Sequence, residues 1–269
     1  MTVVVSPKLV EEKVRESPLL SRAYQVVSRD PEVRELLRMS NVMAVGRLLY
    51  NDHGPVHAAI VTGSALEIFD MLYESGVTPS TLMDETLEDP EEARLVVLLG
   101  AYLHDIGNSV HRENHELIGV YIADRLLDRL LPEIAPEWGL DKRVRLKSEV
   151  LHSIYATAPG VQALTVEAGV VKVADATDMA EGRARIPYLK GKMDMHSLSA
   201  LSIKRVELET GSMRPVRINV YMTSFAGFFQ VERVLLPKVK TTVIREYVEV
   251  APYIIKPDGA TEPLPLIHP

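Results

Sequence analysis

Apolar residues recur at three- and four-residue steps through most of the first two hundred positions, which is the spacing of α-helices. Asp30 and Pro31 have the residue types of a helix N-cap and a first helical position. Gly76 follows a second periodic run and has the residue type that ends helices. The pattern predicts helices over about residues 31–49, 57–75, 90–103, 113–131, 141–156 and 164–181.

The pattern changes after about residue 197. Ile203–Glu209 and Val216–Met222 alternate apolar and polar residues, which predicts a β-hairpin. We expect a helix over about 229–247, interrupted or begun at Pro237, and a last strand over 248–256. Four prolines in the last thirteen residues suggest an arm. The expected fold is mainly α: a helical bundle over residues 1–196 and a small α/β appendage over residues 197–269.

Composition places the chain among ordinary globular proteins. It has 269 residues, of which 46% are hydrophobic and 25% charged, so a disordered chain is excluded. The net charge is −7, whereas proteins that bind duplex nucleic acid usually carry a basic surplus. The start lacks the features of a signal peptide, and the most apolar run, Leu95–Leu103, is too short to cross a membrane. We therefore expect a cytoplasmic protein that has neither duplex nucleic acid nor a membrane as partner.

Histidine is concentrated in the helical half. Six of the eight histidines fall within one hundred residues, at positions 53, 57, 104, 111, 115 and 152. Because the chain has no cysteine, any metal must be held by His, Asp and Glu, which favours Mn, Fe, Ni, Zn or Mg. Three sequence elements follow one another along the helices: His53 and His57 in HGPVH, the doublet His104-Asp105, and Asp175 in ADATD. Each is a weak signal alone, but their order is specific.

The segments NDHGPVHA, AYLHDIG and VKVADATD resemble the HD superfamily of metal-dependent phosphohydrolases over roughly residues 45–190. The resemblance implies an HD-type helical bundle in which His57, His104, Asp105 and Asp175 hold a catalytic metal. His53 is similar to the general-acid histidine of the cyclic-nucleotide phosphodiesterase branch.

Two further histidines, His115 and His152, resemble the additional ligands of the two-metal members, with Asp105 as the bridging carboxylate. The alternative is that this pair grips a substrate phosphate. The resemblance therefore leaves open whether one or two divalent ions bind.

An anionic substrate requires cations near the metal. Lys172, Arg183 and Arg185 bracket Asp175 in the sequence, and the two arginines are the stronger phosphate candidates because guanidinium binds oxygen pairs in a fixed fork. The alternative for this basic run is a solvated surface. Arg112 and Arg145 are further candidates.

The expected function is metal-dependent hydrolysis of a phosphate ester, with a nucleotide or cyclic nucleotide as substrate. Asp105 would orient the attacking water, and His53 would protonate the leaving oxygen. Two alternatives remain: a di-iron oxygenase of the same superfamily, which would also need His115 and His152, and a non-catalytic nucleotide-binding sensor. An exposed sheet edge in the appendage would allow a homodimer.

Overall fold

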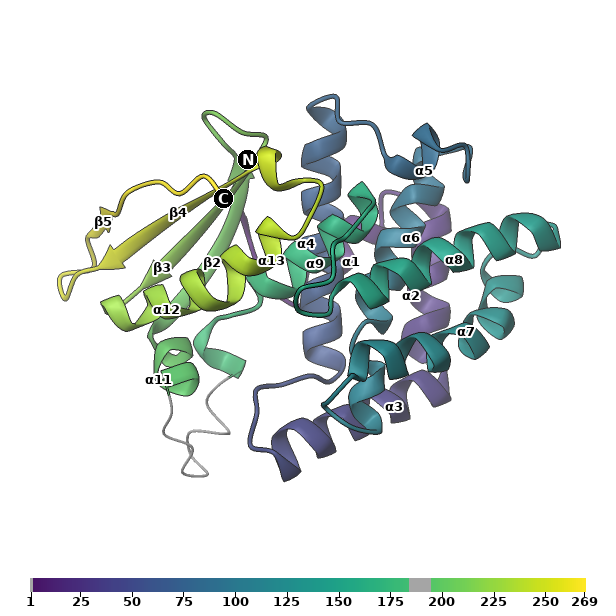
Figure 1. Ribbon diagram of the computed structural model, residues 1–269, viewed down its shortest axis with the longest axis horizontal. Coiled ribbons are helices and arrows are strands. Elements are labelled where there is room, and N and C mark those ends of the chain that lie inside the picture. Colours follow the sequence, from purple (N-terminus) through teal and green to yellow (C-terminus); the bar gives the residue numbers. More distant parts are fainter. Residues whose placement is uncertain (1, 184–194) are drawn as a thin grey trace.

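Helices build most of the first two thirds of the chain, and a sheet with its own short helices lies against one side of them (Figure 1). The computed structural model describes residues 2–183 and 195–269. The helices of the first part are α1 (Leu9–Val14), α2 (Pro18–Arg29), α3 (Pro31–Asn41), α4 (Pro55–Glu74), α5 (Ser80–Met83), α6 (Pro90–Leu103), α7 (His115–Ile134), α8 (Leu140–Ala156) and α9 (Val166–Thr177). The mainly α bundle with a small C-terminal α/β appendage is therefore confirmed.

Local sequence signals explain where these helices begin. The side chain of Asp30 accepts a hydrogen bond from the backbone N–H of Val33 at 3.0 Å, and Pro31 follows it at the first helical position. Asp89 caps α6 in the same way, by accepting from the N–H of Glu91 at 2.8 Å. Such caps satisfy N–H groups that a helix end would otherwise leave unpaired.

Helices α4, α6 and α9 pack on one another at the centre of the bundle. Every residue of α6 from Glu92 to Leu103 is buried, so this helix runs through the core. Within residues 2–183 and 195–269, only α4 is long and apolar enough to cross a membrane by length and composition, and 67% of its most apolar window is buried inside the fold. That burial is typical of a core helix.

The sheet has the order β1-β2-β3-β4-β5. Its strands are β1 (Val3–Val4), β2 (Ile203–Thr210), β3 (Val216–Met222), β4 (Val248–Ile255) and β5 (Thr261–Pro263). Strands β2 and β3 form the expected antiparallel hairpin, and β4 runs parallel to β3. The first residues of the chain extend the sheet of its last part, because Val3 pairs with Leu208. The predicted domain boundary at residue 196 falls inside helix α11 (Met195–Ser202) and stays a prediction.

The helix expected over about 229–247, interrupted or begun at Pro237, ends earlier than expected. The chain is helical through α12 (Phe228–Gln230), a π-helical stretch (Val231–Leu235) and α13 (Leu236–Lys240), and Arg245–Tyr247 form a separate 3₁₀ turn. Helix α13 ends where Thr242 donates its hydroxyl to the carbonyl of Val239 at 2.8 Å. Short polar side chains that bond nearby backbone groups compete with the helical ladder, so the chain turns at this point and meets α9.

Candidate metal centre

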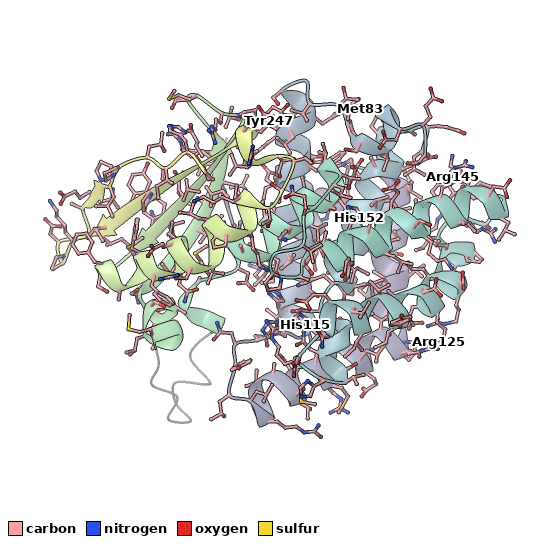
Figure 2. The ribbon with its side chains drawn as sticks, in the orientation of Figure 1. Met83, His115, Arg125, Arg145, His152 and Tyr247 are labelled. Carbon is pink, nitrogen blue, oxygen red and sulfur yellow. The ribbon has the colours of Figure 1, made fainter. Side chains whose placement is uncertain are left out.

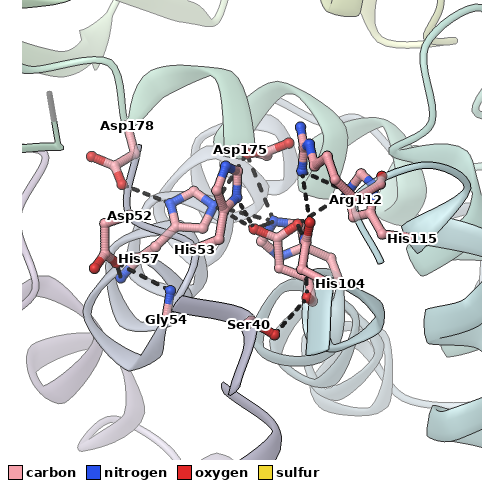
Figure 3. A network of polar contacts seen from close by, with 12 residues as sticks. Ser40, Asp52, His53, Gly54, His57, His104, Arg112, His115, Asp175 and Asp178 are labelled. Atoms are coloured by element: carbon pink, nitrogen blue, oxygen red, sulfur yellow. Dashed lines mark hydrogen bonds and ion pairs between the residues drawn. The ribbon is translucent and has the colours of Figure 1, made fainter. Parts of the chain in front are cut away.

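Four side chains, from α4, from α9 and from the turn that follows α6, converge in the core of the bundle (Figure 3). The Nε2 atom of His57 lies 3.3 Å from Nε2 of His104, 3.3 Å from Oδ2 of Asp105 and 3.3 Å from Oδ1 of Asp175. The Nε2 atom of His104 lies 3.4 Å from the same oxygen of Asp105 and 3.7 Å from that of Asp175. The four residues that the resemblance predicted to be metal ligands are therefore neighbours in the fold.

These separations fit a metal ion. Donor atoms placed roughly 2.0–2.2 Å from a tetrahedral ion lie about 3.3–3.6 Å from one another. The separations given above fall in or close to that range. Two imidazoles and two carboxylates also form a donor set that suits zinc, iron, manganese or nickel. The chain could thus hold a divalent ion at this point.

The end of α6 explains how two adjacent residues face one ion. Successive residues of a helix point about 100° apart, so His104 and Asp105 would diverge if α6 continued. The helix instead ends at Leu103, and Asp105 has left the helical conformation, with φ −102° and ψ 1°. Both side chains can then turn toward His57, which lies in the first turn of α4.

Each metal-facing histidine is oriented by a hydrogen bond on its other nitrogen. Nδ1 of His57 donates to Oδ2 of Asp178 at 2.7 Å, and Nδ1 of His104 donates to the carbonyl of Ala101 at 2.8 Å. With the proton on Nδ1, the lone pair of Nε2 faces the cluster, which is the arrangement found around protein-bound metals. Sequence reasoning gave Asp178 no role, although it closes the ADATD motif.

Asp178→Asn tests this orientation. The amide keeps the size of the carboxylate but is a weaker acceptor, so we expect the affinity for Mn²⁺ to fall by roughly 10–100-fold. Isothermal titration of the metal-free chain measures it. Asp124→Asn is the matched control, because Asp124 lies at the surface and pairs with Lys147. If the variant binds Mn²⁺ as tightly as the unchanged protein, Asp178 does not orient His57 for metal binding.

Neighbouring groups keep both carboxylates ionised. Burial alone would raise the pKa of Asp105, but His104, His53 and His115 outweigh it and hold that pKa well below its usual value. For Asp175, burial is likewise outweighed, first by Lys238 and then by His104 and His57, so its pKa is also well below the usual value. Two ionised, buried carboxylates favour a cation between them.

His53 and His115 lie on either side of Asp105. Nδ1 of His53 is 2.5 Å from Oδ2, and Nε2 of His115 is 3.2 Å from Oδ1. Together with His57, His53 and Asp105 make a second group with metal-ligand spacing. Because Nδ1 of His57 is bonded to Asp178, its Nε2 alone is left for a metal, and the two groups overlap. A second ion held by His115 and a general-acid role for His53 stay predictions.

His152 lies outside this cluster, which corrects the expectation that it faces Asp105 (Figure 2). Its Nε2 accepts a hydrogen bond from the backbone N–H of Leu164 at 3.2 Å, and burial lowers its pKa. The face of α8 that meets the bundle is that of the next two residues: Ser153 lies against Gly100, and Ile154 against Gly119. His152 therefore holds the loop after α8.

We accordingly expect His152→Ala to leave the metal content of the purified protein unchanged. The variant loses only the bond to Leu164, and its thermal stability should drop slightly. Elemental analysis of the two proteins after identical metal loading decides this. A loss of one equivalent would restore His152 as a ligand.

Three basic residues were predicted to bind the substrate phosphate: Lys172, Arg183 and Arg185. Lys172 is fully buried, and its ammonium group donates to the carbonyls of Ala158 and Val161 at 3.0 and 2.5 Å. Burial lowers its pKa to about 8. It holds the loop after α8, and its predicted role in binding substrate stays a prediction. The side chain of Arg183 and the whole of Arg185 lie outside the described residues. Their predicted role in binding substrate therefore stays a prediction.

Two other cations border the cluster. Nη1 of Arg112 lies 3.1 Å from Oδ1 of Asn108 and 3.1 Å from Nε2 of His115. Lys238, from α13 of the appendage, contacts Oδ2 of Asp175. Sequence reasoning considered Arg112 but missed Lys238, because nothing in the sequence connects it with a residue 63 positions earlier.

A cavity of about 300 Å³ adjoins the site on the Asp178 side of His57. Its lining is largely apolar and includes Val45, Val56 and Ile60 from the bundle and Val206 from β2. The cavity therefore lies where the helical bundle meets the sheet.

Comparison with known proteins adds two findings. The model of the HD domain family matches residues 57–180, a range that begins at His57 and includes His104, Asp105 and Asp175. The chain is also similar to an uncharacterized protein, MJ1020, of Methanocaldococcus jannaschii. The two are 45% identical over 227 residues, which cover 84% of this chain and 86% of the relative. No solved structure matches the chain.

Proposed function

Because the chain belongs to the HD domain family, a family of metal-dependent hydrolases, we propose that it is a phosphohydrolase that cleaves a phosphate ester of a nucleotide or cyclic nucleotide. One observation carries the proposal: Nε2 of His57 lies 3.3 Å from Nε2 of His104, from Oδ2 of Asp105 and from Oδ1 of Asp175, which is the spacing of donor atoms around a metal ion.

A divalent ion bound there would supply a Lewis acid for the phosphoryl oxygens and activate a water molecule for attack. The chain's own groups do the rest. Oδ1 of Asp105 accepts from Nδ2 of Asn108 at 2.9 Å, which fixes the carboxylate so that Oδ2 faces the two ligand histidines. His53 lies at the edge of the cluster and is 9% exposed, against 1% for His57 and for His104. In this proposal it protonates the leaving oxygen.

Charge and shape around the site support an organic phosphate as substrate. Arg112 places a cation beside the centre, next to Asn108 and His115, and such a group stabilises phosphoryl oxygens. An apolar cavity on the Asp178 side of His57 could hold the organic group of such a substrate. The net charge of −7 supports a small substrate over duplex nucleic acid. A cytoplasmic location and a homodimer are further parts of the proposal.

The alternatives receive less support. A di-iron oxygenase would need both extra histidines, and His152 is bonded to the Leu164 backbone instead. A non-catalytic sensor would have no need for a complete ligand set, whereas His104, Asp105 and Asp175 all lie beside Nε2 of His57.

The proposal is tested by loading the metal-free chain with Mn²⁺ and, separately, with Fe²⁺, Ni²⁺, Zn²⁺ or Mg²⁺. Each form is incubated with nucleoside monophosphates, cyclic nucleotides, p-nitrophenyl phosphate and bis-p-nitrophenyl phosphate. We expect metal-dependent hydrolysis that EDTA stops. A fully loaded protein that hydrolyses none of these esters would contradict the proposal, and consumption of oxygen by the iron form would favour the oxygenase.

A further inference from the structure

Lys238 joins the appendage to the candidate metal centre. It lies on α13, and its ammonium group contacts Oδ2 of Asp175, the ligand contributed by α9. We propose that Lys238 is a positioning residue that holds Asp175 ready for the metal, so that the appendage completes the centre. The inference rests on the metal site of the proposed function and does not depend on which ester is cleaved.

The two oxygens of Asp175 have different partners. Oδ1 lies 3.3 Å from Nε2 of His57 and 3.7 Å from Nε2 of His104, on the metal side, whereas Oδ2 faces Lys238. The terminal torsion of an aspartate is broad and roughly two-fold, so an unrestrained carboxylate could turn either edge toward an ion. A charge-assisted hydrogen bond on one oxygen restricts this rotation and leaves the other oxygen for the metal.

The contact is also well protected. The side chain of Lys238 is 21% exposed and that of Asp175 is 14% exposed, so water screens the pair less than it would at the surface. A lysine in such a place loses side-chain entropy, and the bond to a buried carboxylate offsets this cost.

Close packing places Lys238 at this point. A Cβ added to Gly169 on α9 would lie 3.2 Å from Cγ1 of Ile244 and 3.3 Å from Cβ of Thr242, so the segment after α13 packs tightly against this glycine. The backbone N–H of Ala163 donates to the carbonyl of Thr241 at 2.9 Å. Helix α13 is thus fixed against α9, and Lys238 has little freedom to move away from Asp175.

A role in binding the substrate phosphate would predict a different behaviour. A lysine that binds substrate alters KM and leaves the affinity for the metal alone. A lysine that positions a ligand alters the affinity for the metal when no substrate is present. Metal titration without substrate separates the two roles.

The experiment titrates Mn²⁺ into the metal-free, full-length protein by calorimetry. We expect Lys238→Met to weaken Mn²⁺ binding by roughly 10–100-fold, the usual effect of removing a group that orients a ligand. Lys238→Arg should recover most of the loss, because arginine can donate to the same oxygen. Lys240→Met is the matched control, since Lys240 lies two residues away on the same helix and is exposed, and it should bind Mn²⁺ as the unchanged protein does.

A double-mutant cycle ties the effect to Asp175. In the background Asp175→Asn, where the charged acceptor is gone, Lys238→Met should cause little further loss. An equal loss in both backgrounds would contradict the inference, as would unchanged Mn²⁺ binding by Lys238→Met. If that variant does not fold by circular dichroism, Lys238→Gln serves in its place.

The outcomes also separate this inference from the proposed function. A protein that binds Mn²⁺ with the expected dependence on Lys238 but hydrolyses no phosphate ester would refute the phosphohydrolase and leave the positioning role intact. A protein that hydrolyses esters, and whose Lys238→Met variant binds Mn²⁺ as tightly as the unchanged chain, would refute the positioning role alone. Absence of binding of any of the five ions named above by the unchanged protein would refute both.

Discussion

Asp105→Ala is expected to abolish metal-dependent hydrolysis while the protein stays folded. Oδ2 of Asp105 lies 3.3 and 3.4 Å from the two ligand nitrogens, so the variant loses a direct ligand. The loss of activity should exceed the roughly 10–100-fold that a group acting through a ligand costs. The preceding helix does not depend on this residue, because its core is made by Leu95, Val96, Leu98, Leu99 and Leu103, all with 0% exposure.

Turnover after metal loading and far-ultraviolet circular dichroism together measure this result. Asp124→Ala is the control, since that side chain is 50% exposed and removing it should change neither quantity. If Asp105→Ala keeps its metal and its turnover, Asp105 has no part in the reaction. If the variant unfolds, the centre serves stability instead of catalysis.

The second large effect is expected from Gly107→Ala, two residues after Asp105. A Cβ at this position would lie 1.9 Å from the carbonyl oxygen of His115 and 2.6 Å from the backbone nitrogen of Gly119. Both atoms belong to the backbone of α7, so no side-chain rotation can make room. Such overpacking should cost at least about 3 kcal/mol of stability, which corresponds to a fall in Tm of about 6–12 °C for a domain of this size.

Thermal unfolding of the metal-free protein measures the change. Gly46→Ala is the matched control, because an added Cβ there meets nothing within 4 Å, and its Tm should be equal or slightly higher. An unchanged Tm for Gly107→Ala would mean that the turn after α6 does not touch α7 as described. In that case the described contact between His115 and Asp105 would also be contradicted, because it depends on the same packing of the turn against α7.

Much of the fold follows from signals that are local in the sequence. The periodic runs and their caps, such as Asp30 and Asp89, predicted six helices of the bundle but not α1, α2 or α5. The alternating segments predicted the hairpin of β2 and β3. The helices and the hairpin could be predicted because neighbouring residues determine them. The four residues that converge in Figure 3 were predicted in another way, through the resemblance of three short segments to the HD superfamily.

Features that depend on distant contacts could not be predicted in this way. Strand β1 has two residues, too few for any pattern, and exists because β2 offers a free edge. His152 was assigned inward, but the 100° step between residues of a helix turned Ser153 and Ile154 to the core instead. Lys172 lies beside the metal ligands in sequence yet bonds to a loop, whereas Lys238 reaches Asp175 from the appendage.

The most direct test of the central claim is a crystal structure of the Mn²⁺-loaded protein with anomalous diffraction data. The account predicts an anomalous peak enclosed by His57, His104, Asp105 and Asp175, with each donor atom roughly 2.0–2.3 Å from the ion. A peak at some other place in the protein, with these four side chains unbound, would contradict it.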